Sequence, residues 1–366
     1  MDAPLDEKLK AVKWGEYRLG DLFEINPTKW YKLTNEQIMS KNGTVPLVSN
    51  SSIDNGVMGF SSLEANNSGN SISCSDTTLG ADTMYYQKDD FIGYQHIQHL
   101  VSKFLPFNQE IALYIISACR VATSNAGYDY GHKFNRDAMN STIIHLPQTN
   151  DGEIDFDFME SFIREIKEEN MCKLSAYLTT TGLSDYTLTE SESNALRTID
   201  SLEWREFKVE KLFGKSTRGK RLKSDDRTEG DLPFVTAGEA DTGISAFISN
   251  EVEVFSKNTT TIDMFGSAKY RNYDYGADDH VAVVHTENLD KFAAIFVTTA
   301  CHKSAHNGQF NYGHNFYAKD ADELNIMLPV RDGAPNYMAM QELICAVQKL
   351  VIKDVVLYAN KKIASV

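Results

Sequence analysis

The stretch Trp14-Gly-Glu-Tyr-Arg-Leu-Gly-Asp-Leu-Phe23 returns 190 residues later as Trp204-Arg-Glu-Phe-Lys-Val-Glu-Lys-Leu-Phe213, and this repeat decides the fold. Further pairs follow in the same order, at separations that fall through 187 to 182 residues: 43–48 with 230–235, 54–60 with 241–247, 130–134 with 312–316, and 146–147 with 328–329. A repeat of this kind predicts one scaffold built twice, with small insertions and deletions in its loops.

Each half reads as a compact unit of about 140 residues followed by a helix. Short apolar runs rich in β-branched residues, bounded by Gly, Asn, Asp and Ser, predict strands at 45–48, 71–74, 234–235, 260–262 and 281–284. Short buried helices are expected at 107–120 and 291–299. We therefore expect a duplicated, mixed α/β fold dominated by its sheets, with one unit at 1–150 and the other at 202–331.

A long helix follows each unit, in the spacers 151–180 and 332–366, and each spacer opens on an Asp-Gly pair. Apolar side chains three and four residues apart form one stripe on each helix, Phe158, Phe162 and Ile166 in the first and Met340, Ile344, Val347 and Val351 in the second. Either stripe could pack on its own unit. We favour pairing of the two equivalent helices with each other, which would hold the units at a fixed separation, with 181–201 as a polar linker.

Composition limits the function. The chain is 42% hydrophobic and has no run near the roughly 20 apolar residues that a membrane span needs, so we expect a cytoplasmic protein. Its five cysteines are scattered singly, which argues against disulfides and a zinc site. A net charge of −15 argues against a protein that coats DNA by itself. Acidic residues concentrate in 151–169 and basic residues in 215–227, as expected if one surface meets a protein and another meets phosphate.

The motifs of an enzyme are missing. The sequence has neither a Walker loop nor the glycine-rich turn that cradles a dinucleotide or S-adenosylmethionine. Asn26-Pro27-Thr28-Lys29-Trp30 departs from the Asn-Pro-Pro-aromatic motif of amino-methyltransferases, because it lacks the second proline and inserts a residue before the aromatic. His96 and His99 lack a third metal ligand nearby. We therefore expect no catalytic residue, no metal site and no cofactor bound by this chain.

Reading DNA requires directed donors and acceptors for base edges, chiefly Arg, Lys, Asn and Gln, with further contacts to phosphate. Such residues gather in the segments that differ between the halves, as expected when one scaffold displays two different readers. The candidates in the first half are Asn50, Ser51, Gln95, His96, Gln98, Lys103, Arg120, Asn125, Tyr128, Lys133 and Arg136. The candidates in the second half are Lys215, Arg218, Lys220, Arg221, Lys223, Lys269, Arg271, Lys303, His306 and Gln309.

Both halves share four features: the Trp-x-x-Tyr/Phe-x-Leu/Val-x-x-Leu-Phe opening, the Val-Pro-Leu-Val or Leu-Pro-Phe-Val strand entry, the Leu-Pro…Asp-Gly exit and the trailing helix. Together these features resemble the specificity subunits of type I restriction-modification systems. The short spacers and the Tyr-Gly-His-Lys/Asn-Phe segments look especially like the related type IIB subunits. The resemblance implies two target-recognition domains, antiparallel packing of the two helices as a coiled coil, and no catalytic residues. It also implies a methyltransferase, or a fused nuclease-methyltransferase, that binds the helices and supplies S-adenosylmethionine chemistry, with Mg²⁺ if it cleaves DNA.

Two other functions stay open at this point. A stand-alone DNA-modifying or DNA-cleaving enzyme of duplicated fold would depend on residues such as Glu165 or His96 for turnover. A carbohydrate-binding β-protein is suggested by the polar run 66–71 and by abundant Ser, Thr and Gly, although no signal peptide is evident.

Overall fold

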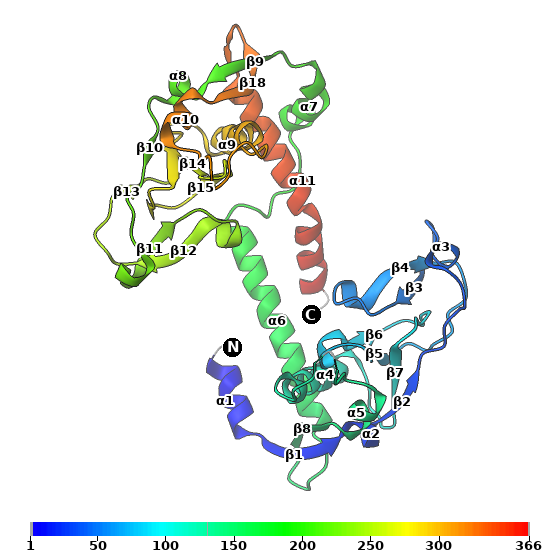
Figure 1. The fold of residues 1–366 in the computed structure, drawn as a ribbon. Coiled ribbons are helices and arrows are strands. Elements are labelled where there is room, and N and C mark those ends of the chain that lie inside the picture. The colour runs from blue at the N-terminus through cyan, green and yellow to red at the C-terminus, as the bar shows by residue number, and fades with distance from the viewer. Residues whose placement is uncertain (1–2, 130, 365–366) are drawn as a thin grey trace. The chain divides into compact units, whose positions relative to one another are not determined.

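A computed structural model describes residues 3–129 and 131–364 and divides the chain into two compact units, Met1–Leu174 and Ser175–Ser365 (Figure 1). None of the described helices is long and apolar enough to cross a membrane.

The first unit combines a four-stranded sheet of order β2-β7-β5-β6 with the hairpin β3-β4 and the terminal pair β1-β8. All neighbouring strands in these sheets are antiparallel. The elements are α1 (Ala3–Ala11), β1 (Lys13–Arg18), α2 (Leu19–Leu22), β2 (Phe23–Pro27), α3 (Asn35–Ile38), β3 (Val45–Val48), η1 (Asp54–Gly56), β4 (Val57–Ser61), β5 (Ser71–Ser75), η2 (Ala81–Thr83), β6 (Tyr85–Gln87), β7 (Ile97–Ser102), α4 (Gln109–Ser124), α5 (Arg136–Ser141), β8 (Ile143–Gln148) and α6 (Phe156–Thr180), whose last residues belong to the second unit.

The second unit repeats this plan, with sheet orders β10-β17-β14-β15, β12-β11-β16-β13 and β19-β18-β9. Its elements are α7 (Glu190–Thr198), η3 (Ile199–Ser201), β9 (Trp204–Lys208), α8 (Val209–Phe213), β10 (Thr217–Arg218), η4 (Ser224–Asp226), β11 (Glu229–Val235), η5 (Ala240–Gly243), β12 (Ile244–Ile248), β13 (Val254–Phe255), β14 (Thr259–Asp263), β15 (Ala268–Arg271), β16 (Tyr275–Ala277), β17 (Val281–Val284), α9 (Lys291–Ala305), α10 (Ala318–Glu323), β18 (Asn325–Arg331), β19 (Ala334–Pro335) and α11 (Tyr337–Ile363).

The two units share register as well as strand order. In the first unit Trp14 of β1 lies opposite Pro147 of β8, and in the second unit Trp204 of β9 lies opposite Pro329 of β18. The five predicted strands are confirmed, and the two predicted buried helices are α4 and α9, each extending further at its C-terminal end. β13 and β16 add two strands beside the hairpin of the second unit.

The central strands are buried on both faces. All five residues of β5 and all five of β14 are buried, so neither strand shows the alternation of a half-exposed strand. Ile72 and Cys74 of β5 join the core formed with α4, and Ile262 of β14 joins the equivalent core formed with α9. The remaining positions are polar, Ser in β5 and Thr and Asp263 in β14, and they hydrogen-bond within their own unit.

The two long helices begin in the same way. The side chain of Asp155 accepts a hydrogen bond from the backbone of Phe158 at 2.9 Å, and that of Asn336 accepts one from Ala339 at 3.1 Å. The turns before them contain Gly152 and Gly333 at φ of 86° and 80°, a conformation that glycine adopts without steric cost. The glycine of each repeated Asp-Gly pair therefore forms the turn before the helix, and a separate residue three positions later caps the helix.

The beginning of each helical stripe packs on its own unit. Phe162 is buried and lies edge-on to Tyr114 of α4 at 6.0 Å, and Met340 is buried in the core of the second unit. Further along α11, Val347 and Val351 expose 41% and 75% of their surface. The first turns of each long helix therefore pack on their own unit, which is the interpretation that we favoured less. Pairing of the two helices with each other stays a prediction.

The predicted linker, residues 181–201, contains the helix α7, which is bonded to α11. Glu192 of α7 and Lys349 of α11 form an ion pair of 3.0 Å, with side chains only 8% and 11% exposed. The Cys345 thiol donates to the other oxygen of Glu192, and Lys349 also pairs with Asp185 at 3.3 Å. Burial alone raises the pKa of Glu192, but the Cys345 thiol, the Thr189 backbone and Lys349 outweigh it and lower the pKa from 4.5 to about 2.

The Lys349→Met variant should lower the free energy of unfolding by roughly 3 kcal/mol, because it leaves a buried carboxylate unpaired. Chemical denaturation of the full chain measures the change, with exposed Lys353→Met on the same helix as the control. Since the pKa of Glu192 is lower in the folded state, its stabilisation is present above pH 4.5 and is lost as the pH falls toward 2. An equal effect of both substitutions would contradict a special role for this pair.

Candidate nucleic-acid interface

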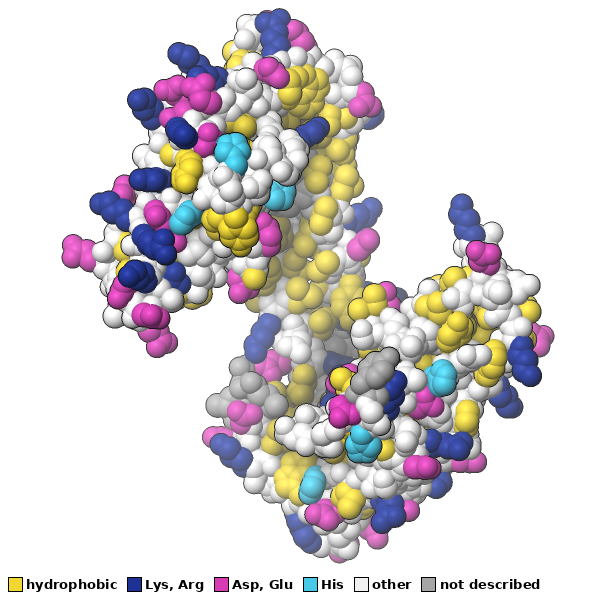
Figure 2. Space-filling model, in the orientation of Figure 1, with side chains coloured by type: hydrophobic (Ala, Val, Ile, Leu, Met, Phe, Trp, Pro, Cys, Tyr) yellow, Lys and Arg dark blue, Asp and Glu magenta, His cyan; other side chains and the backbone are white. Residues whose placement is uncertain are grey.

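The loop around β10 in the second unit carries five basic side chains that face solvent: Lys215, Arg218, Lys220, Arg221 and Lys223. None of the five pairs with another side chain in the described part of the chain. Figure 2 shows Lys and Arg side chains along the edge of this unit that carries β10, with carboxylates between them. A concentration of unpaired cations in a chain of net charge −15 marks this edge as a candidate phosphate-binding surface.

The backbone of this basic loop is fixed, although its side chains are free. The Ser216 amide donates to Asp322 of α10 at 2.7 Å, and the Lys220 amide donates to the Ala277 carbonyl at 3.0 Å. Gly219 lies so close to that carbonyl that a Cβ atom would come within 1.7 Å of the oxygen. The guanidinium of Arg227 holds the far end through the Leu222 carbonyl. The loop therefore presents its cations from a preorganised backbone.

Two acidic residues lie under the loop. Burial raises the pKa of Asp278, and the adjacent Asp279 carboxylate adds to the increase. With His280 they form the only group of three in the described chain whose ligand atoms lie within 4.8 Å of one another. All three are partly exposed neighbours on one turn, and His280 already pairs with Asp279 at 3.0 Å. A hydrogen bond from the Leu222 backbone acts on the pKa of Asp278 in the opposite direction, so this carboxylate lies against the basic loop.

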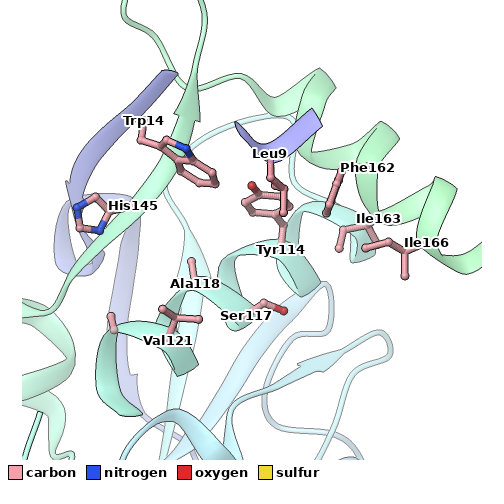
Figure 3. Close-up of a pocket in the computed structure, with 11 residues that line it drawn as sticks. Leu9, Trp14, Tyr114, Ser117, Ala118, Val121, His145, Phe162, Ile163 and Ile166 are labelled. Atoms are coloured by element: carbon pink, nitrogen blue, oxygen red, sulfur yellow. The ribbon is translucent and has the colours of Figure 1, made fainter. Parts of the chain in front are cut away.

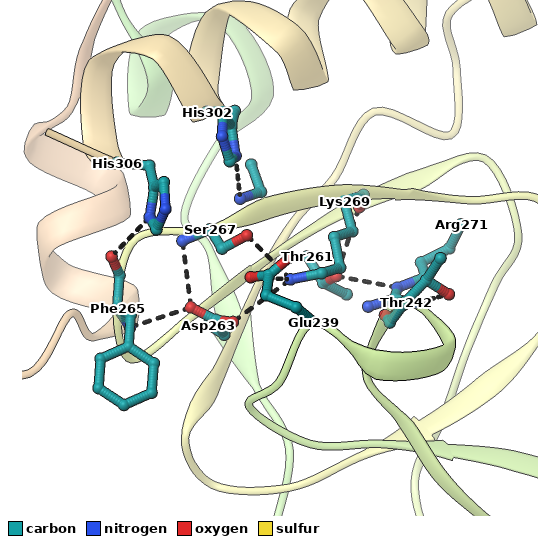
Figure 4. A network of polar contacts seen from close by, with 11 residues as sticks. Glu239, Thr242, Thr261, Asp263, Phe265, Ser267, Lys269, Arg271, His302 and His306 are labelled. Carbon is teal, nitrogen blue, oxygen red and sulfur yellow. Dashed lines mark hydrogen bonds and ion pairs between the residues drawn. The ribbon is translucent and has the colours of Figure 1, made fainter. Parts of the chain in front are cut away.

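Two candidates from the second half turn out to be structural. Lys269 pairs with Glu239 at 3.1 Å and with Asp263 at 3.4 Å, and its side chain is 13% exposed. Figure 4 shows this network of polar contacts. Arg271 is only 1% exposed, and its guanidinium donates to the Thr242 carbonyl at 2.8 Å. We therefore remove Arg271 from the set that can reach DNA, and Lys269 is committed to its two carboxylates.

The buried guanidinium has a role in shaping a loop. Thr242 and its neighbour Asp241 have φ angles of 55° and 46°, which are costly for residues with a side chain. Arg271 bonds to the Thr242 carbonyl, to the Thr261 hydroxyl at 2.9 Å and to the Tyr273 hydroxyl at 2.9 Å. It thereby holds the η5 turn in this conformation from inside the unit.

The remaining candidates of the second half lie at the end of α9. Lys303, His306 and Gln309 are exposed. His306 donates from Nδ1 to the Phe265 carbonyl at 3.1 Å, and the Gln309 amide donates to the Ser304 carbonyl at 3.1 Å. His306 and Gln309 are thus oriented by the backbone, whereas the Lys303 ammonium has no partner in the described chain.

The first unit presents a more neutral set. Asn50, Gln95 and His96 are exposed and Ser51 is partly exposed. His96 has a φ of 64° and pairs with Asp76 at 3.3 Å, so its position is held by the fold. Gln98 is 4% exposed and donates to the same Asp76 at 2.7 Å, which makes it a structural residue and removes it from the set that can reach bases.

The other candidates of the first half lie on α4, on α5 and in the loops beside them. Lys103 donates to the Gly20 carbonyl at 2.6 Å, and Arg120 donates to the Met84 carbonyl at 3.1 Å, so both cations help to hold the unit together. Tyr128 is partly exposed and Lys133 has an interaction partner, whereas Asn125 and Arg136 are exposed. The first unit therefore lacks a free cationic loop like that of the second unit in the described residues.

One segment was missed by the sequence reasoning. The repeat aligns the basic loop with residues 25–33, where Lys29, Trp30 and Lys32 are exposed. The Lys29 backbone is held at both ends by the Asn67 side chain, at 2.8 Å each. The separation of 190 residues between the two Trp-to-Phe motifs was the signal that could have found this loop.

Each unit also has an apolar groove beside its long helix. The groove of the first unit, about 370 Å³, is seen in Figure 3 between Trp14, α4 and α6. The groove of the second unit, about 700 Å³, lies between Trp204, α9 and α11. Equivalent residues line both: Trp14 with Trp204, Tyr114 with Phe296, Ser117 with Thr299, Ala118 with Ala300, His145 with Met327, and Ile163 with Ile344. The same surface is therefore built twice.

The residues that an enzyme mechanism would need are not brought together. Glu165 lies on α6 and pairs with Lys8 of α1 at 2.5 Å. His96 lies in the turn before β7 and pairs with Asp76. Glu165 and His96 therefore each have their own ion-pair partner, and they do not form a common site.

Comparison with known proteins agrees with this geometry. The model of the type I restriction modification DNA specificity domain matches residues 11–175 and again 201–364. The type II restriction enzyme BgcI specificity subunit S.BcgI of Heyndrickxia coagulans is 27% identical over 283 residues, covering 75% of this chain and 78% of that protein. The crystal structure of a type I restriction-modification S subunit from M. genitalium has a TM-score of 0.65 at 14% identity and covers 97% of this chain and 93% of that one, which confirms the duplicated fold.

Replacing Arg218 and Arg221 together with alanine should weaken DNA binding by roughly tenfold or more. The slope of log affinity against log salt should also fall by about 2, since each phosphate contact contributes about 0.9. Titration of labelled duplex DNA at several salt concentrations measures both quantities. The double variant Arg205→Ala with Arg331→Ala removes the same charge from exposed positions of the same unit, and a similar loss there would show that net charge alone is responsible.

Proposed function

The chain belongs to the family of type I restriction-modification DNA specificity domains, and we propose that it reads an asymmetric, bipartite DNA site through its two target-recognition domains. It is a specificity subunit, the non-catalytic component of an enzyme complex.

The observation that carries the proposal is one scaffold with two different sets of exposed side chains. β1 and β8 pair in the same register as β9 and β18, so the two domains are equivalent at their base. Their loops differ: the second domain exposes five unpaired cations around β10, whereas the equivalent loop of the first domain exposes only Lys29 and Lys32. The first domain also exposes Asn50, Gln95 and Asn125. Arg and Lys bind guanine edges and phosphate, whereas Asn and Gln suit adenine. Two unlike half-sites follow from two unlike surfaces.

A fixed gap between the half-sites follows from the spacers. α6 and α11 are rigid elements of 25 and 27 residues that leave the two domains from equivalent positions. If they pack on each other as an antiparallel coiled coil, the distance between the readers is set by the helices. By analogy with paired recognition units, the half-sites would lie about one helical turn of DNA apart.

The chemistry would come from a partner. A methyltransferase, or a fused nuclease-methyltransferase, would bind the helices and supply S-adenosylmethionine, with Mg²⁺ if it cleaves DNA. Among the candidate helix residues, Val347 and Val351 are exposed, while Phe162 and Met340 are buried in their own domains and support the surface from beneath. The two grooves lie beside the same helices, and Trp14 and Trp204 at their rims are 43% and 36% exposed. Exposed aromatic and aliphatic groups at a groove favour protein binding.

Val351→Asp should abolish copurification with the co-expressed methyltransferase, because it places a charge in the exposed stripe of α11 on which both helix pairing and docking are proposed to depend. Binding of duplex DNA by the purified chain should be unchanged. Val254→Asp is the matched control, since Val254 is an exposed valine of β13 in the same domain. Retention of the methyltransferase by the Val351 variant would rule out this stretch of α11 as the docking surface.

Exchange of residues 1–150 for the equivalent domain of a relative tests the proposed function as a whole. The complex with the methyltransferase is expressed in cells, and modified bases are mapped by sequencing the genome. We expect one half-site of the modified sequence to change while the other half-site and the gap stay the same. An unaltered recognition sequence would refute the two-reader proposal.

A further inference from the structure

The motif Tyr-Gly-His-x-Phe occurs once in each domain, at 130–134 and 312–316, and the functions assigned so far do not explain it. It is retained in both halves although the loops near it have diverged. Phe134 and Phe316, its last residues, are buried and anchor the motif in the two domain cores.

In the second domain the motif forms a tightly held turn. The Asn311 side chain accepts a hydrogen bond from the Gly313 amide at 2.9 Å, and the Asn311 amide donates to the His314 carbonyl at 3.0 Å. The Phe310 ring supports the turn from inside, at 5.2 Å from the His314 ring and 4.9 Å from the Phe316 ring.

The first domain builds the same turn from different residues. The Asp129 side chain accepts from the Gly131 amide at 2.7 Å, and the Asp129 amide donates to the His132 carbonyl at 2.9 Å. Tyr128 takes the place of Phe310, with its ring 5.1 Å from His132 and 5.3 Å from Phe134. Tyr130 itself lies outside the described residues. The backbone geometry is therefore repeated even where the side chains that hold it are not.

The tip of the second turn is presented to solvent. Tyr312 is 86% exposed, touches only the edge of Phe265 among the described rings, and has no hydrogen-bond partner for its hydroxyl in the described chain. His314 is exposed and donates from Nδ1 to the Gln309 carbonyl at 3.2 Å, which leaves Nε2 directed away from that bond. The Tyr312 ring contributes little to the stability of the fold, because it is hardly buried. Since the turn is already ordered, a ligand contact with this ring would cost the chain little conformational entropy.

The turn lies between elements that lead to the two groups of candidate DNA-binding residues. α10 begins four residues after His314, and its Asp322 accepts the hydrogen bond that holds the start of the basic loop. On the other side, Phe265 contacts Tyr312 and accepts a hydrogen bond from His306 at the end of α9. The turn thus connects the two groups of candidate DNA-binding residues in this domain.

We propose that the Tyr312 turn contacts the sugar-phosphate backbone of DNA, and that the equivalent turn of the first domain, where His132 is exposed, lies against the backbone of the other half-site. The two half-sites differ in their bases but share the same sugar-phosphate backbone. Residues that are repeated in both domains are therefore suited to contact the DNA backbone, and residues that differ between the domains are suited to contact the bases. The Tyr312 hydroxyl is a hydrogen-bond donor for phosphate oxygens. The Nε2 of His314 donates to phosphate only when the ring is protonated, because Nδ1 carries the proton that bonds to the Gln309 carbonyl. This inference rests on the proposed DNA-reading function and adds a contact that is independent of sequence.

The test compares Tyr312→Ala, Tyr312→Phe and Tyr177→Ala, whose target is a 58% exposed tyrosine of α6. Binding to two duplexes of unrelated sequence is measured by fluorescence anisotropy at several salt concentrations, for the purified full chain alone and for its complex with the methyltransferase. Tyr312→Ala should weaken binding to both duplexes by the same factor, about fivefold, and Tyr312→Phe by about twofold. The salt slope should not change, because no cation is removed. Tyr177→Ala should bind like the unaltered chain.

A loss confined to one duplex would identify Tyr312 as a base reader and overturn the proposal. Unchanged DNA binding with lost copurification of the methyltransferase would assign the turn to a protein interface and overturn it as well. If the unaltered chain bound neither duplex, either alone or in complex with its methyltransferase, the proposed function itself would be refuted, whereas normal binding by the unaltered chain and by Tyr312→Ala alike would refute only the contact proposed for the turn.

Discussion

The structure depends on the antiparallel pairing of the first and last strands of each domain. Trp14 opposite Pro147, and Trp204 opposite Pro329, bring the beginning and the end of each domain together at one base. Every loop between these strands is then displayed from a closed scaffold, and the long helix leaves from the same base. Because the pairing involves the backbone and a few apolar side chains, the loops are free to diverge without loss of the fold.

Within the loops, the division between anchored and free side chains decides what each domain offers to DNA. Arg271, Gln98 and Arg120 have the chemistry of base-reading residues, but their hydrogen bonds are directed into the protein. The cations around β10 have a backbone held at Ser216 and Lys220 and no partner for their side chains in the described chain. An unpaired cation on a fixed backbone binds phosphate without first giving up an internal ion pair.

Much of this architecture was predictable from the sequence, because the two halves of a duplicated chain can be aligned with each other. The repeated Trp-to-Phe motif gave the two domains, and the Asp-Gly pairs marked the starts of α6 and α11. Burial of a single polar residue was not predictable, since Arg271 and Arg218 look alike in sequence and differ only in the tertiary contacts around them. Helix α7 was not predicted, because its segment is polar and the ion pair of Glu192 with Lys349 forms only in the folded structure. How α6 and α11 pack remains a prediction.

The most direct test of the central claim is selection of bound duplexes from a random DNA library by the complex of the unaltered chain with its methyltransferase. Because one scaffold carries two unlike surfaces, the selected sequences should contain two different half-sites separated by a gap of constant length. A single continuous site, two identical half-sites, or a gap of variable length would contradict the account.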